Sequence, residues 1–312
     1  MQLIHSNMIW DCAPHNAFTD LVRFNGALYC IFREGEAHVC AHGALRLLKS
    51  VDEGQTWQSV YQFTVKGRDL RDGKLVVFNG LLLAFGAGPV REPQRAPLQS
   101  FVWKSADGST WSKPKPIAEQ GEWLWRIAKY QDRLYGVAYF PNEDDGYVAL
   151  YQSEDGDNYR AIIERFNQQG YVNESGLSFI STSVSDQLQT QAYCLLRRDP
   201  VWSDEQLALL GVASAPFTDW RWVELDKRVG GPVTFVYQDK LYAVVRLYDE
   251  QVRTAIVHID IERHIVNELI RLPSAGDTSY AGVVVEGDEL LVSYYSSHEV
   301  KTAIYFAKVA LS

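Results

Sequence analysis

The sequence lacks several features that would place a protein in a common functional class. It contains no hydrophobic run long enough to cross a membrane, no glycine-rich phosphate-binding loop and no H-E-x-x-H motif. Its formal net charge of -9 gives no excess of positive charge, which argues against nucleic acid or an anionic membrane as the main partner. Any positively charged binding site must therefore be a local pocket in an otherwise acidic protein.

Cysteine is scarce, and its spacing excludes the common metal motifs. The four cysteines, Cys12, Cys30, Cys40 and Cys194, contain no C-x-x-C pair, so the sequence predicts no metal and no cofactor. Cys30 and Cys194 fall at equivalent places of different repeats, which favours reduced, buried thiols. The opening MQLIHS lacks the charged and apolar regions of a signal peptide, so we expect a soluble cytoplasmic protein.

Amphipathic helical patterns are missing as well, and a repeat of strand pairs takes their place. Six segments averaging roughly 50 residues each begin with two apolar strands joined by a short turn. The strand pairs occupy residues 21–32, 75–85, 127–138, 177–196, 234–245 and 283–294. Their turns carry Asn-Gly, Gln-Asp or Gly-Asp, which is typical of hairpins. We predict an all-β, six-bladed β-propeller that forms a single domain over residues 1–312, with a strand near residues 3–10 completing the last blade.

A second repeated pattern marks the blade edges. Residues 50–57, SVDEGQTW, fit the Asp-box pattern S-x-D-x-G-x-T-W, and residues 105–111 are a copy one residue shorter. Residues 153–159 and 214–220 are more distant versions. Asp and Ser can cap a tight turn, Gly allows positive φ, and Trp can fill the space between sheets, so these segments are predicted to be structural.

Three arginines share one register of the repeat. Arg33 ends LYCIFR, Arg197 ends AYCLLR and Arg246 ends LYAVVR, each after an apolar strand. If the repeats surround an axis, the three guanidinium groups converge. Guanidinium binds carboxylate through two parallel hydrogen bonds, so the arrangement predicts a clamp for an acidic ligand, such as a carboxylated sugar.

Asp-boxes on six blades, with arginines from blades one, four and five, resemble the sialidase superfamily over the whole chain. The resemblance implies a tyrosine nucleophile activated by a glutamate, because a neutral phenol is not repelled by the substrate carboxylate. Tyr280, in DTSYAG at the start of the inner strand of blade six, is similar to that nucleophile. Glu174, in VNESG, is similar to the activating glutamate. Arg197, with Arg198 as the alternative, and Arg246 match two of the arginines.

The first blade departs from the sialidase pattern. Residues 13–20 carry no Arg-Ile-Pro-like segment, and Arg33 instead resembles a secondary arginine that touches the sugar ring. The expected acid/base aspartate is replaced by Glu36, Ala37 and His38. His38 is the candidate proton donor, since its ordinary pKa suits proton transfer near neutrality. His15 and His298 are alternatives.

Further candidates lie at the starts of other inner strands. Asp20, Asp72 and Arg126 could bind sugar hydroxyls, and a carboxylate among them could supply the missing acid. Trp123 and Trp125 could stack on a sugar face or could be buried between blades.

Three functions are compatible with these residues. The first is a retaining exo-glycoside hydrolase acting on a terminal acidic sugar, with Tyr280, Glu174 and His38 as catalytic residues. The second is a polysaccharide lyase that eliminates across a uronate with a His/Tyr pair. The third is a glycan-binding propeller without catalysis, because a fold does not imply a chemistry.

Overall fold

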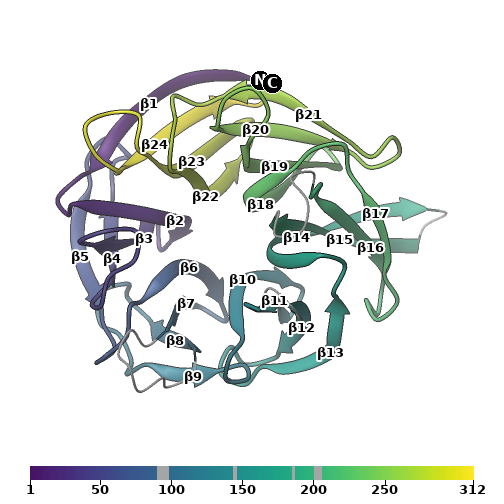
Figure 1. The fold of residues 1–312 in the computed structure, drawn as a ribbon, viewed down its shortest axis with the longest axis horizontal. Helices are drawn as coiled ribbons and strands as arrows, with labels where there is room; N and C mark the ends of the chain where they lie inside the picture. Colours follow the sequence, from purple (N-terminus) through teal and green to yellow (C-terminus); the bar gives the residue numbers. More distant parts are fainter. Residues whose placement is uncertain (90–97, 143–145, 185–186, 200–205) are drawn as a thin grey trace.

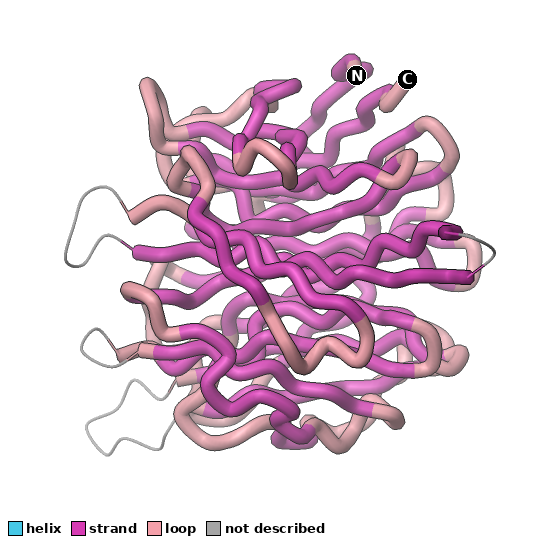
Figure 2. Tube along the Cα trace, turned by 90° about the vertical axis from the view of Figure 1, so that its right-hand side faces the viewer, coloured by secondary structure: helices cyan, strands magenta, loops and turns pink. Residues whose placement is uncertain are grey.

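The computed structural model describes residues 1–89, 98–142, 146–184, 187–199 and 206–312. Within these ranges the chain forms 24 strands in six four-stranded antiparallel sheets around a central axis (Figure 1). The side view contains strands and loops but no helix in these ranges (Figure 2). The described residues accordingly include no helix that could cross a membrane. The fold is the predicted six-bladed propeller.

The blades follow one another along the chain. Blade 1 comprises β2 (His15–Phe24), β3 (Ala27–Gly35), β4 (Ala44–Ser50) and β5 (Gln58–Phe63). Blade 2 comprises β6 (Arg71–Phe78), β7 (Leu81–Gly88), β8 (Gln99–Ser105) and β9 (Lys115–Ile117). Blade 3 comprises β10 (Trp123–Tyr130), β11 (Arg133–Phe140), β12 (Tyr147–Ser153) and β13 (Arg160–Asn167). Blade 4 comprises β14 (Tyr171–Val184), β15 (Gln187–Asp199), β16 (Leu209–Ser214) and β17 (Arg221–Glu224). Blade 5 comprises β18 (Val229–Tyr237), β19 (Lys240–Leu247), β20 (Arg253–Asp260) and β21 (Ile265–Arg271).

Blade 6 closes the ring with strands from both ends of the chain. It contains β22 (Thr278–Glu286), β23 (Glu289–Ser296), β24 (Ala303–Ala310) and, as its outermost strand, β1 (Gln2–Trp10). The pairing of β1 with β24 places the two termini side by side (Figure 1). The predicted closing strand is therefore confirmed, and main-chain hydrogen bonds hold the first and last parts of the sequence together.

The hairpin turns have the backbone that their residues predict. Asn25 and Gly26, between β2 and β3, have φ angles of 47° and 76°. Gln238 and Asp239, between β18 and β19, have φ angles of 48° and 56°. Two successive positive φ angles match the right-handed twist of the flanking strands. In the predicted 177–196 pair, the strands are β14 and β15, and residues 185–186 lie outside the described residues.

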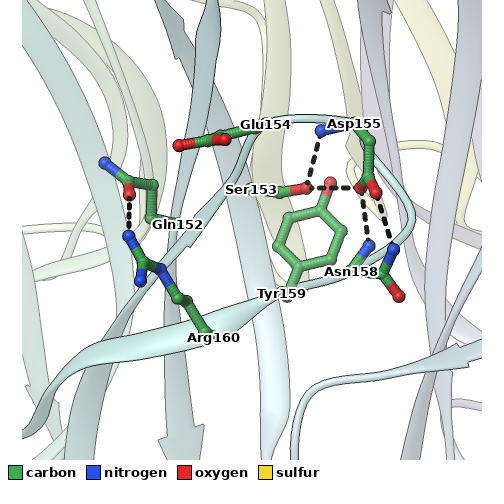
Figure 3. A pocket seen from close by; sticks show the side chains of 7 residues that line it. All are labelled: Gln152, Ser153, Glu154, Asp155, Asn158, Tyr159 and Arg160. Carbon is green, nitrogen blue, oxygen red and sulfur yellow. Dashed lines mark hydrogen bonds between the residues drawn. The ribbon is translucent and has the colours of Figure 1, made fainter.

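The four segments predicted as Asp-boxes each join the third strand of a blade to the fourth. In blade 3, Ser153 Oγ accepts the N–H of Gly156 at 2.9 Å. Asp155 Oδ1 accepts the N–H of Asn158 at 2.8 Å (Figure 3). The 214–220 segment differs, because there the Trp220 indole donates to the Phe217 carbonyl at 2.8 Å. These segments are local turn structures, stabilised by their own side chains.

Aromatic side chains fill the spaces between neighbouring blades. Phe63 of blade 1 packs against Trp103 of blade 2 with ring centroids 5.1 Å apart. Trp57 of blade 1 meets Phe306 of blade 6 at 5.5 Å, on the other side of the same sheet. Such contacts fix each blade relative to the next, which is what brings side chains from separate repeats together at the axis.

Candidate active site

The innermost strand of every blade is irregular at the same level. Pairing with the second strand is interrupted within residues 17–20, 71–74, 124–126, 172–175, 230–233 and 279–282. Bulges of this kind bend a strand and redirect its side chains. We call one residue from each interruption the bulge ring: Phe18, Asp72, Trp125, Glu174, Gly231 and Tyr280.

Backbone strain accompanies these bulges. Phe18, Asp72 and Tyr280 have φ angles of 61°, 54° and 47°, and Gly231 has a φ of 53°. Positive φ costs little for glycine but is unfavourable for the other three side chains. Strain that the surrounding structure maintains in this way is concentrated at functional sites.

Tyr280 lies where the blades meet. Its ring centroid is 5.2 Å from that of Phe18 in blade 1 and 5.6 Å from that of Trp125 in blade 3. In blade 5, a Cβ added to Gly231 would lie 2.7 Å from the Tyr280 ring. Glycine at position 231 therefore makes room for the tyrosine.

The Tyr280 hydroxyl belongs to a buried hydrogen-bonded group with Glu174 and Arg197. The hydroxyl donates to Glu174 Oε1 at 2.8 Å and accepts from Arg197 Nη1 at 3.0 Å. Arg197 Nη1 also lies 2.6 Å from Glu174 Oε1. The other carboxylate oxygen, Oε2, accepts the N–H of Gly231 at 2.9 Å. Tyr280 comes from blade 6, and Glu174 and Arg197 come from blade 4. The structure thus brings these three sequence-predicted residues into direct contact.

The protonation state of Tyr280 follows from its burial. Burial raises the pKa of Tyr280 well above its ordinary value, although the Arg197 charge opposes the shift. The phenol is therefore neutral near pH 7. Glu174 is a carboxylate already in hydrogen-bond contact with the phenolic proton, which is the geometry a general base requires.

Asp20 and Arg126 hold the strained backbone near Tyr280 and pair with each other. Arg126 Nη1 lies 2.8 Å from Asp20 Oδ1, and its Nη2 donates to the Ala281 carbonyl at 2.8 Å. Asp20 Oδ2 accepts the N–H of Leu75 at 2.8 Å. Both were predicted to bind hydroxyls or to supply an acid. In the structure they pair with each other and connect blades 1, 2, 3 and 6.

Arg246 lies over the face of Tyr280. Its guanidinium carbon is 5.0 Å from the ring centroid, and its Nε donates to the Thr278 carbonyl at 2.7 Å. Nη2 donates to Asp277 Oδ1 at 2.9 Å and to the Tyr295 hydroxyl at 2.8 Å. Asp277 thus compensates the charge of Arg246, as Glu174 does that of Arg197.

Of the two carboxylates in the bulge ring, Asp72 has fewer hydrogen-bond and ion-pair partners than Glu174. Its Oδ1 is buried without a hydrogen-bond partner, and no ion pair involves Asp72 among the described residues. Burial raises the pKa of Asp72 to about 6, while the Lys74 and Arg71 charges oppose the shift. Burial also lowers the pKa of Lys74 to about 8. A carboxyl group that is still partly protonated near neutrality can act as an acid.

Arg71 is a site residue that the sequence reasoning missed. Its guanidinium carbon lies 5.0 Å from the centroid of Phe18 and 6.0 Å from that of Trp123. In the described part of the chain, its side chain forms no ion pair, and its Nε is buried without a hydrogen-bond partner. The only available signal was its place next to Asp72 at the start of an inner strand.

Arg33 does not join this group. Its side chain is 0% exposed, and Nη2 lies 2.8 Å from Oδ1 of Asp69, whose side chain is also 0% exposed. A further hydrogen bond connects Arg33 Nη1 to the Ala37 carbonyl at 2.9 Å. The role predicted for Arg33 as a ligand clamp is therefore corrected, because a buried protein carboxylate already neutralises the guanidinium.

His38 lies at the edge of the site and not beside the nucleophile. Its Nδ1 is 3.0 Å from Asp277 Oδ2, and its side chain is 53% exposed. The Phe18 ring contacts both His38, with centroids 5.3 Å apart, and Tyr280, with centroids 5.2 Å apart. The alternative His15 contacts Asp277 as well, at 3.4 Å.

The remaining candidates are occupied elsewhere. Arg198 donates to the Leu207 carbonyl at 2.6 Å, so the two adjacent arginines separate and Arg197 alone reaches Tyr280. His298 Nδ1 lies 2.8 Å from Ser296 Oγ. Trp125 is 1% exposed, and Trp123 is 7% exposed and stacked on Tyr139, so neither offers an open face to a sugar.

In the comparisons with known proteins, the matches are to solved structures only. No protein-family model matches the chain, and no curated protein matches it in sequence. A protein of unknown function from Dyadobacter fermentans is 16% identical with a TM-score of 0.82, and the match covers 100% of this chain and 99% of that one.

Two enzymes of known activity share the architecture. The GH93 α-L-arabinofuranosidase of Fusarium graminearum is 13% identical with a TM-score of 0.72, covering 100% of this chain and 98% of that one. Trypanosoma rangeli sialidase is 12% identical with a TM-score of 0.67, covering 99% of this chain and 58% of that one. At these identities the likeness shows the fold: a six-bladed propeller that is also found in glycoside hydrolases.

Proposed function

We propose that the protein is a retaining glycoside hydrolase that removes a terminal sugar, with Tyr280 as nucleophile and Glu174 as its base. The supporting observation is the 2.8 Å hydrogen bond from the Tyr280 hydroxyl to Glu174, buried among the bulge-ring residues. The activities named for the arabinofuranosidase and the sialidase of the same architecture support the reaction class.

The proposed reaction has two displacements. First, the Tyr280 oxygen bonds to the anomeric carbon as the bond to the leaving oxygen breaks, and Glu174 takes the phenolic proton. Water then attacks the same carbon and releases Tyr280, which recovers its proton from Glu174. Two inversions give net retention. Arg197 contacts both oxygens at 3.0 Å and 2.6 Å, so it can stabilise the negative charge on either one.

Asp72 is the proposed acid, in place of the aspartate missing from blade 1. Its raised pKa of about 6 leaves part of the population protonated at neutral pH. It would protonate the leaving oxygen in the first step and accept a proton from water in the second. His38 is less suited to this role, because its side chain is 53% exposed and its Nδ1 already faces Asp277.

An acidic sugar is the proposed substrate class, but its carboxylate is proposed to bind a residue other than the three arginines first predicted. Arg33, Arg197 and Arg246 each face a protein carboxylate at 2.9 Å or less. Arg71 has no such partner among the described residues and lies on the aromatic rings of Phe18 and Trp123. A substrate carboxylate on Arg71 would supply the missing counter-charge.

The contacts of Tyr280 do not favour a lyase. A His/Tyr elimination requires the two side chains to face the same sugar carbon, whereas the Tyr280 hydroxyl is bonded to Glu174 and Arg197.

The test is product analysis with sialylated, uronate-terminated and neutral arabinose-terminated oligosaccharides. We expect hydrolysis, in which the products together exceed the substrate mass by one water, on an acidic substrate and not on the neutral one. Tyr280→Phe should lower kcat by about 10³-fold or more, because it removes the nucleophile. The matched control is Tyr237→Phe, which removes a hydroxyl bonded to Asp288 on the exterior and should leave turnover unchanged.

Other outcomes would reject the proposal. Products that sum to the substrate mass, with new ultraviolet absorbance, would establish elimination. Binding without turnover would establish a glycan-binding propeller. Turnover of the neutral substrate alone would keep the hydrolase and reject the acidic sugar.

A further inference from the structure

Three metal-binding side chains from distant parts of the sequence meet where blade 1 adjoins blade 6. His15 begins β2, His38 lies between β3 and β4, and Asp277 directly precedes β22. One nitrogen or oxygen atom from each lies within 4.8 Å of the other two. We propose that these side chains bind a divalent transition-metal ion of the Zn²⁺ class.

The distances between the ligand atoms suit such an ion. A tetrahedral zinc ion with bonds of about 2.0–2.1 Å places its ligand atoms about 3.3 Å apart. His15 Nε2 lies 3.4 Å from Asp277 Oδ2, and His38 Nδ1 lies 3.0 Å from the same oxygen. The ligand nitrogens of the two histidines lie within 4.8 Å of each other, and the exposed side chain of His38 can move to shorten that separation.

Asp277 is oriented by groups outside the cluster. Its Oδ1 accepts hydrogen bonds from the Tyr295 hydroxyl at 2.6 Å and from Arg246 Nη2 at 2.9 Å. These bonds leave Oδ2 facing the two imidazoles. Hydrogen bonds from surrounding residues commonly fix a metal-binding carboxylate in this way.

The residue types select the class of ion. Two imidazoles with one carboxylate suit Zn²⁺ and its neighbours in the first transition series, whereas Ca²⁺ and Mg²⁺ prefer oxygen ligands. The side chain of His38 is 53% exposed and that of His15 is 10% exposed, so the cluster opens to solvent on the His38 side. Solvent or a sugar oxygen could complete the coordination there.

The site is independent of the proposed hydrolase chemistry. None of the three ligands is assigned a catalytic step, although Asp277 also pairs with Arg246. A bound ion would connect blade 1, through His15 and His38, to Asp277, which directly precedes the first strand of blade 6. Metal binding should therefore raise the unfolding temperature, because the ion binds the folded chain preferentially.

The experiment uses full-length, tag-free protein that has been stripped with a chelator. Titration with Co²⁺ should produce the visible absorption of a tetrahedral site, saturating at one ion per chain, and Zn²⁺ should displace it. His38→Ala removes an exposed ligand and should weaken binding by at least about tenfold, since even groups that only orient metal ligands contribute that much. It should also abolish the rise in unfolding temperature with Zn²⁺.

The matched control is His42→Ala, which removes an exposed histidine of the same loop outside the cluster. It should bind Co²⁺ like the wild type. Absence of saturable binding to the wild type, unchanged affinity in His38→Ala, or an equal loss in His42→Ala would each overturn the proposal. An equal loss in His42→Ala would mean that exposed histidines bind the metal nonspecifically.

Discussion

The buried charges of the site differ in how completely the protein compensates them. Glu174 receives hydrogen bonds from Tyr280 and Gly231 and forms an ion pair with Arg197. Asp20 receives hydrogen bonds from Arg126 and Leu75. Asp72, in contrast, has a buried oxygen without a partner. A carboxylate that is buried without partners destabilises the folded chain when it ionises, and such perturbed groups are concentrated at functional sites.

The pKa of Asp72 has a consequence for stability. Between about pH 4 and the folded-state pKa of about 6, the unfolded chain has released this proton while the folded chain still holds it. The contribution of Asp72 to folding stability therefore falls as the pH rises through this window, and it stays lower above it.

Asp72→Asn should remove this penalty while keeping a side chain that tolerates positive φ. Relative to the wild type, we expect the variant to gain up to about 3 kcal/mol between about pH 4 and about pH 8, because the folded-state pKa lies roughly two pH units above the ordinary aspartate value. Denaturant unfolding of both proteins at the two pH values measures this. An equal difference at both pH values would show that Asp72 is not a high-pKa carboxyl.

The same variant tests the acid role with two substrates. Hydrolysis of an oligosaccharide should fall by about 10²–10⁴-fold, because its leaving oxygen requires a proton. Hydrolysis of a nitrophenyl glycoside should fall much less, because nitrophenolate leaves unprotonated. For the wild type, oligosaccharide turnover should decline as the pH rises above about 6. Equal losses on both substrates would assign Asp72 to another role.

At the scale of elements, the turns between third and fourth strands also join neighbouring blades. Gly108, in the segment 105–111 of blade 2, has a φ of +75° and faces Tyr29 of blade 1. A Cβ at this position would overlap the tyrosine ring and hydroxyl. Gly80, in the hairpin turn of the same blade, has the same φ of +75° but nothing within 4 Å of an added Cβ.

Alanine substitutions at these two glycines distinguish the cost of backbone strain from the cost of disturbed packing between blades. Gly80→Ala should cost about 1–2 kcal/mol, because alanine is strained at positive φ. Gly108→Ala should cost about 1–3 kcal/mol more than that, because the methyl group also displaces Tyr29. The measurement is the free energy of unfolding by denaturant. Equal losses would show that the turn does not pack tightly against blade 1.

The strands and their turns could be predicted because their signals are local. Asn25-Gly26 and Gln238-Asp239 specify two-residue hairpin turns, and the alternating apolar strands beside them follow. The bulges of the inner strands could not be read in the same way. Asp72 and Tyr280 adopt positive φ without being glycine, and contacts from other blades surround Tyr280.

At the scale of the whole molecule, the site exists only because six repeats close into a ring. Tyr280, Glu174 and Arg197 could be predicted together, since a resemblance to sialidases orders them along the chain and the propeller brings them to one axis. The partner of each arginine was not predictable in this way. Asp69 neutralises Arg33 and Asp20 neutralises Arg126, and these pairs form across blades that the repeat pattern treats as equivalent.

Closure of the ring also explains why no short motif indicated the His15, His38 and Asp277 cluster. His38 and Asp277 are 239 residues apart in the sequence and 3.0 Å apart in the structure. Arg71 was overlooked for a different reason: a lone basic residue at a strand start has no distinctive pattern, and its significance comes from lacking an ion pair among the described residues.

The most direct measurement of the central claim is covalent trapping of the nucleophile. The protein would be incubated with a difluorosialic acid and, separately, with a fluorouronyl fluoride, and then digested and analysed by mass spectrometry. We predict that one glycosyl group is attached to the Tyr280 oxygen, and that Tyr280→Phe acquires none. A glycosyl group on Glu174 or Asp72, or turnover by Tyr280→Phe at the wild-type rate, would contradict the assignment of Tyr280 as the nucleophile.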